Sequence, residues 1–135
     1  MRWMAVLTSI VALLPQVAGA HVVRHSSIPQ AYWGTWTAGA TCVDGDKTAI
    51  VLSAKAYVSP AARCAVDSVS ETPGEQGATY SARLQCANAT AKAQKKSVAN
   101  LIIRPDGTDR ISLGPSFESL AAYQRCGTAG PSAGQ

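Results

Sequence analysis

The chain contains only two histidines, His21 and His25, and both lie near its start. A histidine at a free amino terminus can chelate a metal ion through its α-amino group and its imidazole, and a second imidazole four residues later can add a third nitrogen. Copper favours amine and imidazole nitrogens of this kind. The chelate requires a mature chain that begins at His21, and the simpler interpretation is a solvated leading segment. Apart from this conditional copper site we expect no metal and no cofactor.

Two pairs of aspartates are the next candidates for chemistry. Asp44 and Asp46 flank a glycine, and Asp106 and Asp109 lie in a second stretch of turn-forming residues. Carboxylates held at different pKa values can perform acid–base catalysis, but aspartates in turns also bond their own backbone. From Trp33 onward no histidine is present to activate a nucleophile. We therefore expect no catalytic residue, and a protein that is not an enzyme.

The four cysteines form an even set without a C-x-x-C pair, which disfavours redox catalysis: Cys42, Cys64, Cys86 and Cys126. In an exported chain such a set predicts two structural disulfides, and three connectivities are open. One is favoured by residues 63–71 and 77–86, which alternate like two strands around the turn TPGEQ. Centring a hairpin on Glu75 opposes four pairs: Ser70 with Tyr80, Ser68 with Ala82, Val66 with Leu84, and Cys64 with Cys86. Opposed Cβ atoms lie about 5 Å apart, close enough for a disulfide, and this leaves Cys42 for Cys126.

Residues 1–20 have the pattern of a secretory signal peptide. Arg2 precedes an apolar run over 5–14, Pro15 interrupts it, and Ala18-Gly19-Ala20 matches a cleavage site. The apolar run is shorter than the roughly 20 residues of a spanning helix. We expect cleavage after Ala20, a periplasmic or secreted protein, and no membrane span in the mature chain.

The remaining 115 residues fit one domain. Only 25 of them are large apolar residues, so the core is thin and disulfides would compensate. The formal charge of the full chain is +4, without a dense Lys/Arg stripe, which excludes nucleic acid as the expected partner. We predict a flexible lead-in over 21–31, a β-domain over 32–126 and a disordered tail over 127–135.

Short strand-like segments separated by turn residues predict an all-β fold, a small antiparallel barrel or a sandwich. Residues 98–113 form a predicted hairpin around the turn PDGT, and residues 117–126 form the predicted final strand, after a helical turn. A closed barrel removes sheet edges, which suits a monomer.

Gly34-Thr35-Trp36 is a G-x-W motif at the first predicted strand of the domain, and Arg125 lies near the end of the last one. This combination resembles the calycin superfamily, which includes lipocalins, avidin-like proteins and small bacterial metalloprotease inhibitors. The resemblance implies a β-barrel in which Trp36 closes one end and Arg125 packs across its ring. A guanidinium over an indole is worth about 0.5–2 kcal/mol.

Candidate contact residues follow from alternation and charge. Trp33 faces the side opposite Trp36, where an aromatic ring can meet a partner. Lys92, Lys95 and Lys96 would share a face if their segment is helical, and an anionic partner would fit it. We therefore expect a non-enzymatic exported binding module that recognises another exported protein, such as an inhibitor of an envelope or extracellular enzyme. The alternatives are a carrier with a small ligand in the barrel and a structural envelope protein.

Overall fold

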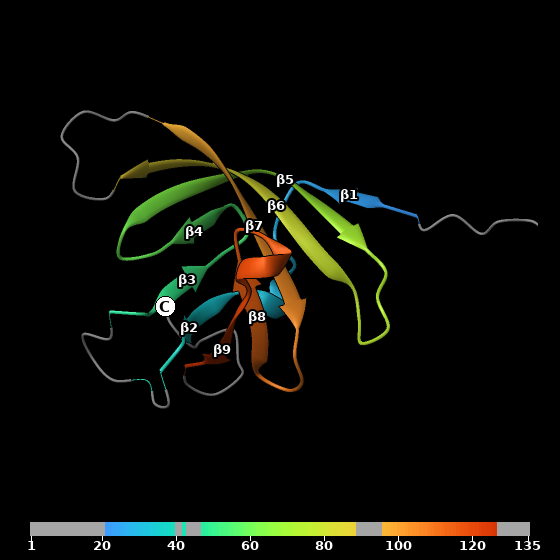
Figure 1. Ribbon diagram of the computed structural model, residues 1–135. Coiled ribbons are helices and arrows are strands. Elements are labelled where there is room, and N and C mark those ends of the chain that lie inside the picture. The colour runs from blue at the N-terminus through green and yellow to red at the C-terminus, as the bar shows by residue number, and fades with distance from the viewer. Residues whose placement is uncertain (1–20, 40–41, 43–46, 89–95, 127–135) are drawn as a thin grey trace, which may run out of the picture.

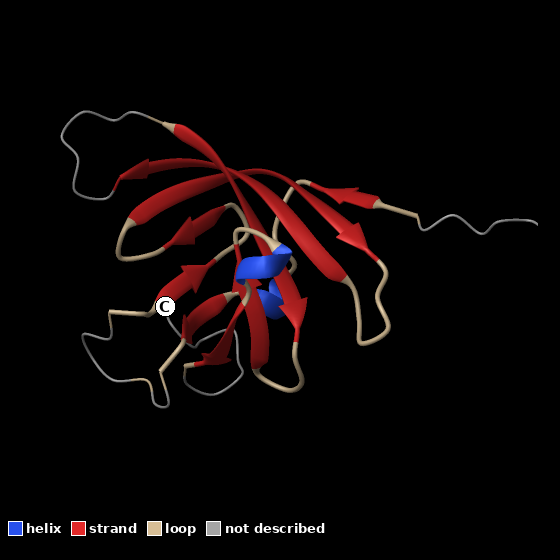
Figure 2. Ribbon diagram, viewed as in Figure 1, coloured by secondary structure: helices blue, strands red, loops and turns tan. Residues whose placement is uncertain are grey.

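A computed structural model describes residues 21–39, 42, 47–88 and 96–126 of the chain. These residues form nine strands: β1 Val23–His25, β2 Gly34–Thr37, β3 Ile50–Leu52, β4 Ala56–Val58, β5 Ala62–Thr72, β6 Thr79–Asn88, β7 Ser97–Pro105, β8 Arg110–Gly114 and β9 Ala121–Arg125. Two short 3-10 turns, η1 Gln30–Tyr32 and η2 Phe117–Ser119, are their only helical elements (Figure 2). In this part of the chain no helix is long and apolar enough to cross a membrane.

Strands β2 to β9 close into an eight-stranded antiparallel barrel (Figure 1). Each strand pairs with its neighbours in sequence, and β9 returns to pair with β2. β1 lies outside this ring, on the edge of β5 beyond the stretch that pairs with β4. The predicted all-β class and antiparallel barrel are confirmed. One end of the barrel carries η1 and the β3–β4, β5–β6 and β7–β8 connections, and the other end carries η2.

The buried side chains of the barrel interior come from β2, β3, β5, β6, β7 and β8, with Ile28 inserted from the N-terminal segment, and Tyr57 of β4 and Tyr123 of β9 pack against them partly buried. Alternation places them there: in β3, Ile50 and Leu52 are buried while Val51 faces outward. The buried cluster is Ile28, Trp36, Ile50, Leu52, Cys64, Val66, Val69, Ala82, Leu84, Leu101, Ile103, Ile111 and Leu113.

Both predicted disulfides are confirmed. Cys64 and Cys86 are directly opposed on β5 and β6 with Cα atoms 4.0 Å apart. Cys42 bonds Cys126, with Cα atoms 5.5 Å apart, and so ties the β2–β3 connection to the end of β9. Two disulfides are compatible with an exported protein.

The predicted β5–β6 register is right near the disulfide and wrong beyond it. Cys64 opposes Cys86 and Val66 opposes Leu84, but the register then shifts by one residue between Val66 and Ser68. The shift turns Val69 into the core, where it is fully buried. It also sets Glu71, instead of Ser70, opposite Tyr80.

The segment 21–31 differs from the predicted flexible lead-in. Residues Val23–His25 form β1 against β5, and Ile28 is fully buried. Apolar and polar residues do not alternate in this segment, because only a three-residue strand and one separate side chain, Ile28, contact the barrel. The predicted signal peptide, the predicted tail, Lys92 and Lys95 lie outside the described residues.

Candidate functional site

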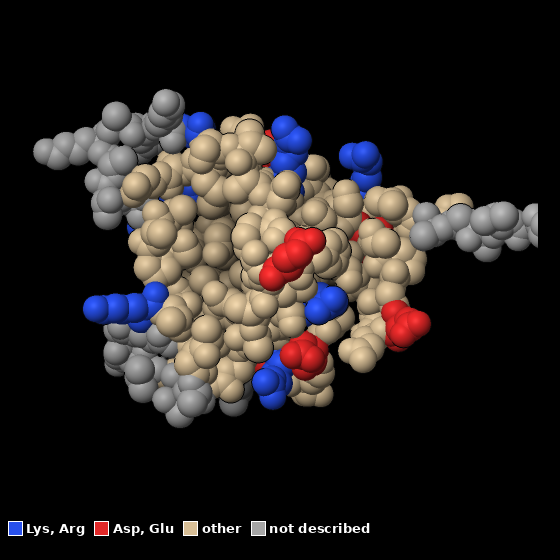
Figure 3. Space-filling model, in the orientation of Figure 1, with Lys and Arg blue, Asp and Glu red and all other residues tan. Residues whose placement is uncertain are grey.

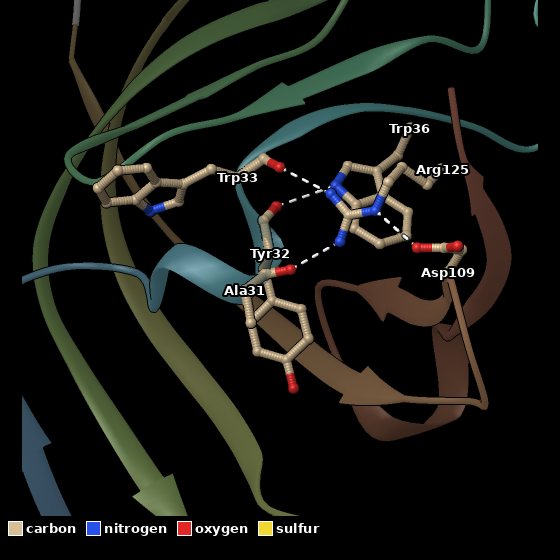
Figure 4. Close-up of polar contacts among 6 residues, drawn as sticks. All are labelled: Ala31, Tyr32, Trp33, Trp36, Asp109 and Arg125. Atoms are coloured by element: carbon tan, nitrogen blue, oxygen red, sulfur yellow. Dashed lines mark hydrogen bonds and ion pairs between the residues drawn. The ribbon is translucent and has the colours of Figure 1, made fainter. Parts of the chain in front are cut away.

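The end of the barrel beside η1 is closed by Trp36, which is 1% exposed (Figure 4). Its indole N–H donates to the carbonyl oxygen of Tyr32 over 2.9 Å. The guanidinium carbon of Arg125 lies 4.3 Å from the centre of the Trp36 ring. The structure thus places Arg125 across the ring of Trp36, as the resemblance to calycins implied for these two residues.

Arg125 uses its remaining donors to fasten the segment around η1. Its Nη1 donates to the carbonyl of Trp33 over 2.8 Å, and its Nη2 donates to the carbonyl of Ala31 over 2.7 Å. Its Nε donates to Oδ1 of Asp109 over 3.0 Å. We call Trp36, Arg125 and Asp109 the clamp.

Two backbone positions make the clamp possible. Gly34 has φ +128°, and a Cβ there would lie 3.4 Å from Nη1 of Arg125. Asp109 has φ +54°, a left-handed conformation that aspartate tolerates better than most residues. Its carbonyl oxygen accepts from the backbone N–H of Arg125 over 2.8 Å, while its carboxylate holds the side chain. The sequence predicted Asp109 only as a turn residue.

A second polar cluster joins β1, β5 and β6. Nε2 of His25 donates to Oε2 of Glu71, and the hydroxyl of Tyr80 donates to Oε1 of the same carboxylate, both over 2.9 Å. These hydrogen bonds, that of His25 first, hold the pKa of Glu71 below its ordinary value. Burial and the hydrogen bond to Glu71 raise the pKa of Tyr80 to about 12. We call His25, Glu71 and Tyr80 the latch.

The latch borders a recess of about 370 Å³ between β1 and the β5–β6 turn. Its wall is mostly apolar, and Glu71 is its one acidic residue; the lining residues are His21, Val23, Glu71, Pro73, Gly74 and Ala78. His21 therefore shares the recess with Glu71, whereas His25 bonds that carboxylate directly. The described residues contain no group of three or more histidines, cysteines or carboxylates placed to hold a metal ion.

The exposed aromatic side chains lie in two different places. Trp33 is 39% exposed, and its indole N–H is tied to the carbonyl of Ile28 over 2.8 Å. Phe117, the single phenylalanine of the chain, is 61% exposed in η2. Sequence reasoning missed Phe117, although its position between Ser116 and Glu118 after a Gly-Pro pair is a signal for a displayed turn residue.

On the face that Figure 3 shows, the positive charge of the described residues is dispersed. Lys96 is exposed just before β7. In Figure 3, the lysines and arginines of the visible face lie apart from one another, most of them near its margin, and an acidic group lies over η2, which contains Glu118. The described residues of this face therefore form no basic patch.

Fold and clamp together define a small disulfide-bonded up-and-down β-barrel whose N-terminal segment is fastened across one end. Comparisons of the chain with protein-family models, with curated proteins and with solved structures give no significant match.

Proposed function

We propose that this protein is a non-enzymatic exported module that binds another exported protein. We also propose that it is a monomer of the periplasm or the extracellular medium, and that it is related to the calycins through its barrel and clamp. The observation that carries the proposal is the display of Phe117 on η2. Inhibition of an envelope or extracellular enzyme is the form of binding that we favour.

The turn that displays Phe117 is braced from both sides. The backbone N–H of Ser119 donates to the carbonyl of Ser116 over 3.1 Å, and the hydroxyl of Ser116 donates to that of Ser119 over 3.1 Å. Gly114, the last residue of β8, fits directly beneath the turn, and a Cβ there would collide with the carbonyl oxygen of Ser119. The backbone on either side of Phe117 is therefore fixed before any partner arrives.

A fixed, exposed aromatic ring is suited to binding a protein. Aromatic anchors contribute a large share of interface energy when they enter a pocket of the partner. Because the turn is already ordered, binding costs less conformational entropy than it would for a mobile loop. Glu118, exposed beside the ring, favours a partner pocket with a basic residue on its rim.

The test is a retention experiment with the chain from His21 onward as bait in the native envelope fraction or culture medium. Phe117→Ser should reduce the amount of the specifically retained protein by a factor of about 30, as expected for an anchor residue. Val98→Ser is the matched control, because Val98 is 59% exposed on β7 and distant in sequence. Its retention should equal that of the wild type.

Equal retention by Phe117→Ser and the wild type would contradict the proposal. A small molecule released on denaturation, without a retained protein, would instead support the carrier.

A further inference from the structure

β1 is attached to the barrel by few contacts of its own. It makes three residue pairs with β5, and its other edge pairs with no strand of the described chain. Val22 and Val23 are 56% and 47% exposed, so their burial contributes little. Three-residue strands at a sheet edge depend on their side-chain contacts to stay in place.

The segment directly after β1 is anchored differently. Ile28 is fully buried, and its backbone N–H donates to the carbonyl of Ala54 over 2.9 Å. Nζ of Lys55 donates to the carbonyl of Ser26 over 2.6 Å. None of these contacts includes a carboxylate. The chain is therefore fixed from Ser26 onward, and residues 21–25 form a separate arm, which we call the strap.

The latch is the main side-chain attachment of the strap. The Glu71 carboxylate accepts from His25 on the strap and from Tyr80 on β6, one donor to each oxygen. Tyr32 of η1 packs edge-on against Tyr80 with ring centres 5.5 Å apart, and His21 shares the recess beside Glu71. Glu71 is the only carboxylate among these groups. The negative charge that holds His25 therefore comes from the Glu71 side chain alone.

We propose that the strap is a releasable edge strand, held on β5 by ionised Glu71 and freed when that carboxyl is protonated. A neutral carboxyl no longer offers the imidazole of His25 a charge-assisted acceptor. The lowered pKa of Glu71 agrees with this direction, because the ionised carboxyl is the form that the attached strap favours.

Release of the strap uncovers the backbone edge of β5 from Val69 to Glu71, which β1 otherwise covers. It also removes one wall of the recess, since His21 and Val23 line it. An uncovered strand edge can pair with another extended chain. The strap is thus a device that keeps this edge covered at neutral pH, independently of any role of Phe117.

Glu71→Gln imitates the neutral carboxyl at neutral pH and allows a direct test with trypsin, which can cut after Arg24 in β1. We expect cleavage after Arg24 about tenfold faster than in the wild type, since the open population rises with the loss of one charge-assisted bond. Glu75→Gln is the matched control, because Glu75 is an exposed glutamate in the turn between β5 and β6 and lies outside the latch. Its cleavage rate after Arg24 should equal that of the wild type.

Cuts at Arg63 and Arg83, inside β5 and β6, report on opening of the barrel in the same digest. An unchanged rate after Arg24 in Glu71→Gln would overturn the proposal. So would acceleration at Arg63 and Arg83 equal to that at Arg24, because the whole barrel would then be opening.

Release of the strap in acid is tested by NMR of the ¹⁵N-labelled wild type between about pH 7 and about pH 3. Carboxyl groups titrate within this range. The amides of Val23–His25 should lose their strand-like shifts towards the acid end, while those of β6 and β7 keep theirs. In Glu71→Gln the same β1 amides should already be shifted at neutral pH. Retention of the β1 shifts throughout the range would refute release by acid.

Discussion

Replacement of Arg125 by methionine removes the guanidinium from the clamp but leaves an unbranched apolar side chain over Trp36. In the wild type the guanidinium donates to two backbone carbonyls, of Trp33 and Ala31, and to the Asp109 carboxylate. Arg125→Met therefore tests whether these polar contacts and the charge over the ring stabilise the fold, apart from simple packing.

The expected loss can be estimated contact by contact. The Arg125 side chain is 14% exposed, whereas that of Asp109 is 45% exposed, so the ion pair adds less than about 1 kcal/mol. The contact with Trp36 is worth about 1 kcal/mol. The two carbonyl bonds come from a charged donor, but water can replace part of them, which leaves about 1 kcal/mol for the pair. Loss of all three contributions should lower the free energy of unfolding by about 2.5 kcal/mol.

Urea unfolding at neutral pH measures this difference. With a slope of about 1.5 kcal/mol per M, the unfolding midpoint should fall by about 2 M. Arg83→Met is the control, because Arg83 is exposed on β6 outside the clamp; its midpoint should stay within about 0.3 M of the wild type. Arg125→Lys should lie between the two, since one ammonium cannot reach three acceptors in the same fork geometry. A midpoint for Arg125→Met equal to that of Arg83→Met would refute the assigned role of the clamp.

Four further predictions concern the core, the two titrating groups of the latch and one disulfide. Trp36→Ala should lower the free energy of unfolding by about 4 kcal/mol in the same assay, because its ring is almost completely buried; an effect under about 1 kcal/mol would contradict the assignment of Trp36 as the barrel plug. The ionised form of Glu71 is favoured in the folded state, so its contribution to stability is present above the ordinary glutamate pKa and is lost as the pH falls through the lowered value. Tyr80 titrates in the opposite sense: its contribution is present below about pH 10 and is lost as the pH rises through about 12. The difference in unfolding free energy between the wild type and Tyr80→Phe should therefore shrink as the pH rises above about 10, and a constant difference would argue against the shift. Replacing Cys64 and Cys86 together by alanine should cost about 3 kcal/mol, whereas an unchanged midpoint would show that the buried bridge contributes nothing.

The fold was largely predictable because its strands alternate. Ile50 and Leu52 in β3, and Ile111 and Leu113 in β8, mark the inward faces directly. The cysteine spacing fixed the part of the β5–β6 register nearest the disulfide.

The prediction failed where one irregular residue changed the pattern. The bulge at Asp67 is invisible to a strict period of two, and it determines that Val69 is buried and that Glu71 meets Tyr80. The latch could not be predicted for this reason, since the expected register opposed Tyr80 to Ser70.

The N-terminal segment was misjudged for a different reason. Its attachments are single contacts of unlike kinds: a buried Ile28, a hydrogen bond from His25 and a short run of strand pairing. Such contacts leave no periodic trace in the sequence. The contact between Trp36 and Arg125 in the clamp, by contrast, was predicted. The G-x-W motif and the late arginine together resemble the calycins, and that resemblance implied the pair.

The most direct test of partner binding through η2 is site-specific photocrosslinking in the native host. A photoreactive phenylalanine analogue replaces Phe117 in one strain and Val98 in another. We predict one discrete protein adduct at position 117 and none of the same mass at position 98. The same adducts at both positions, or none at position 117, would contradict the proposed binding function.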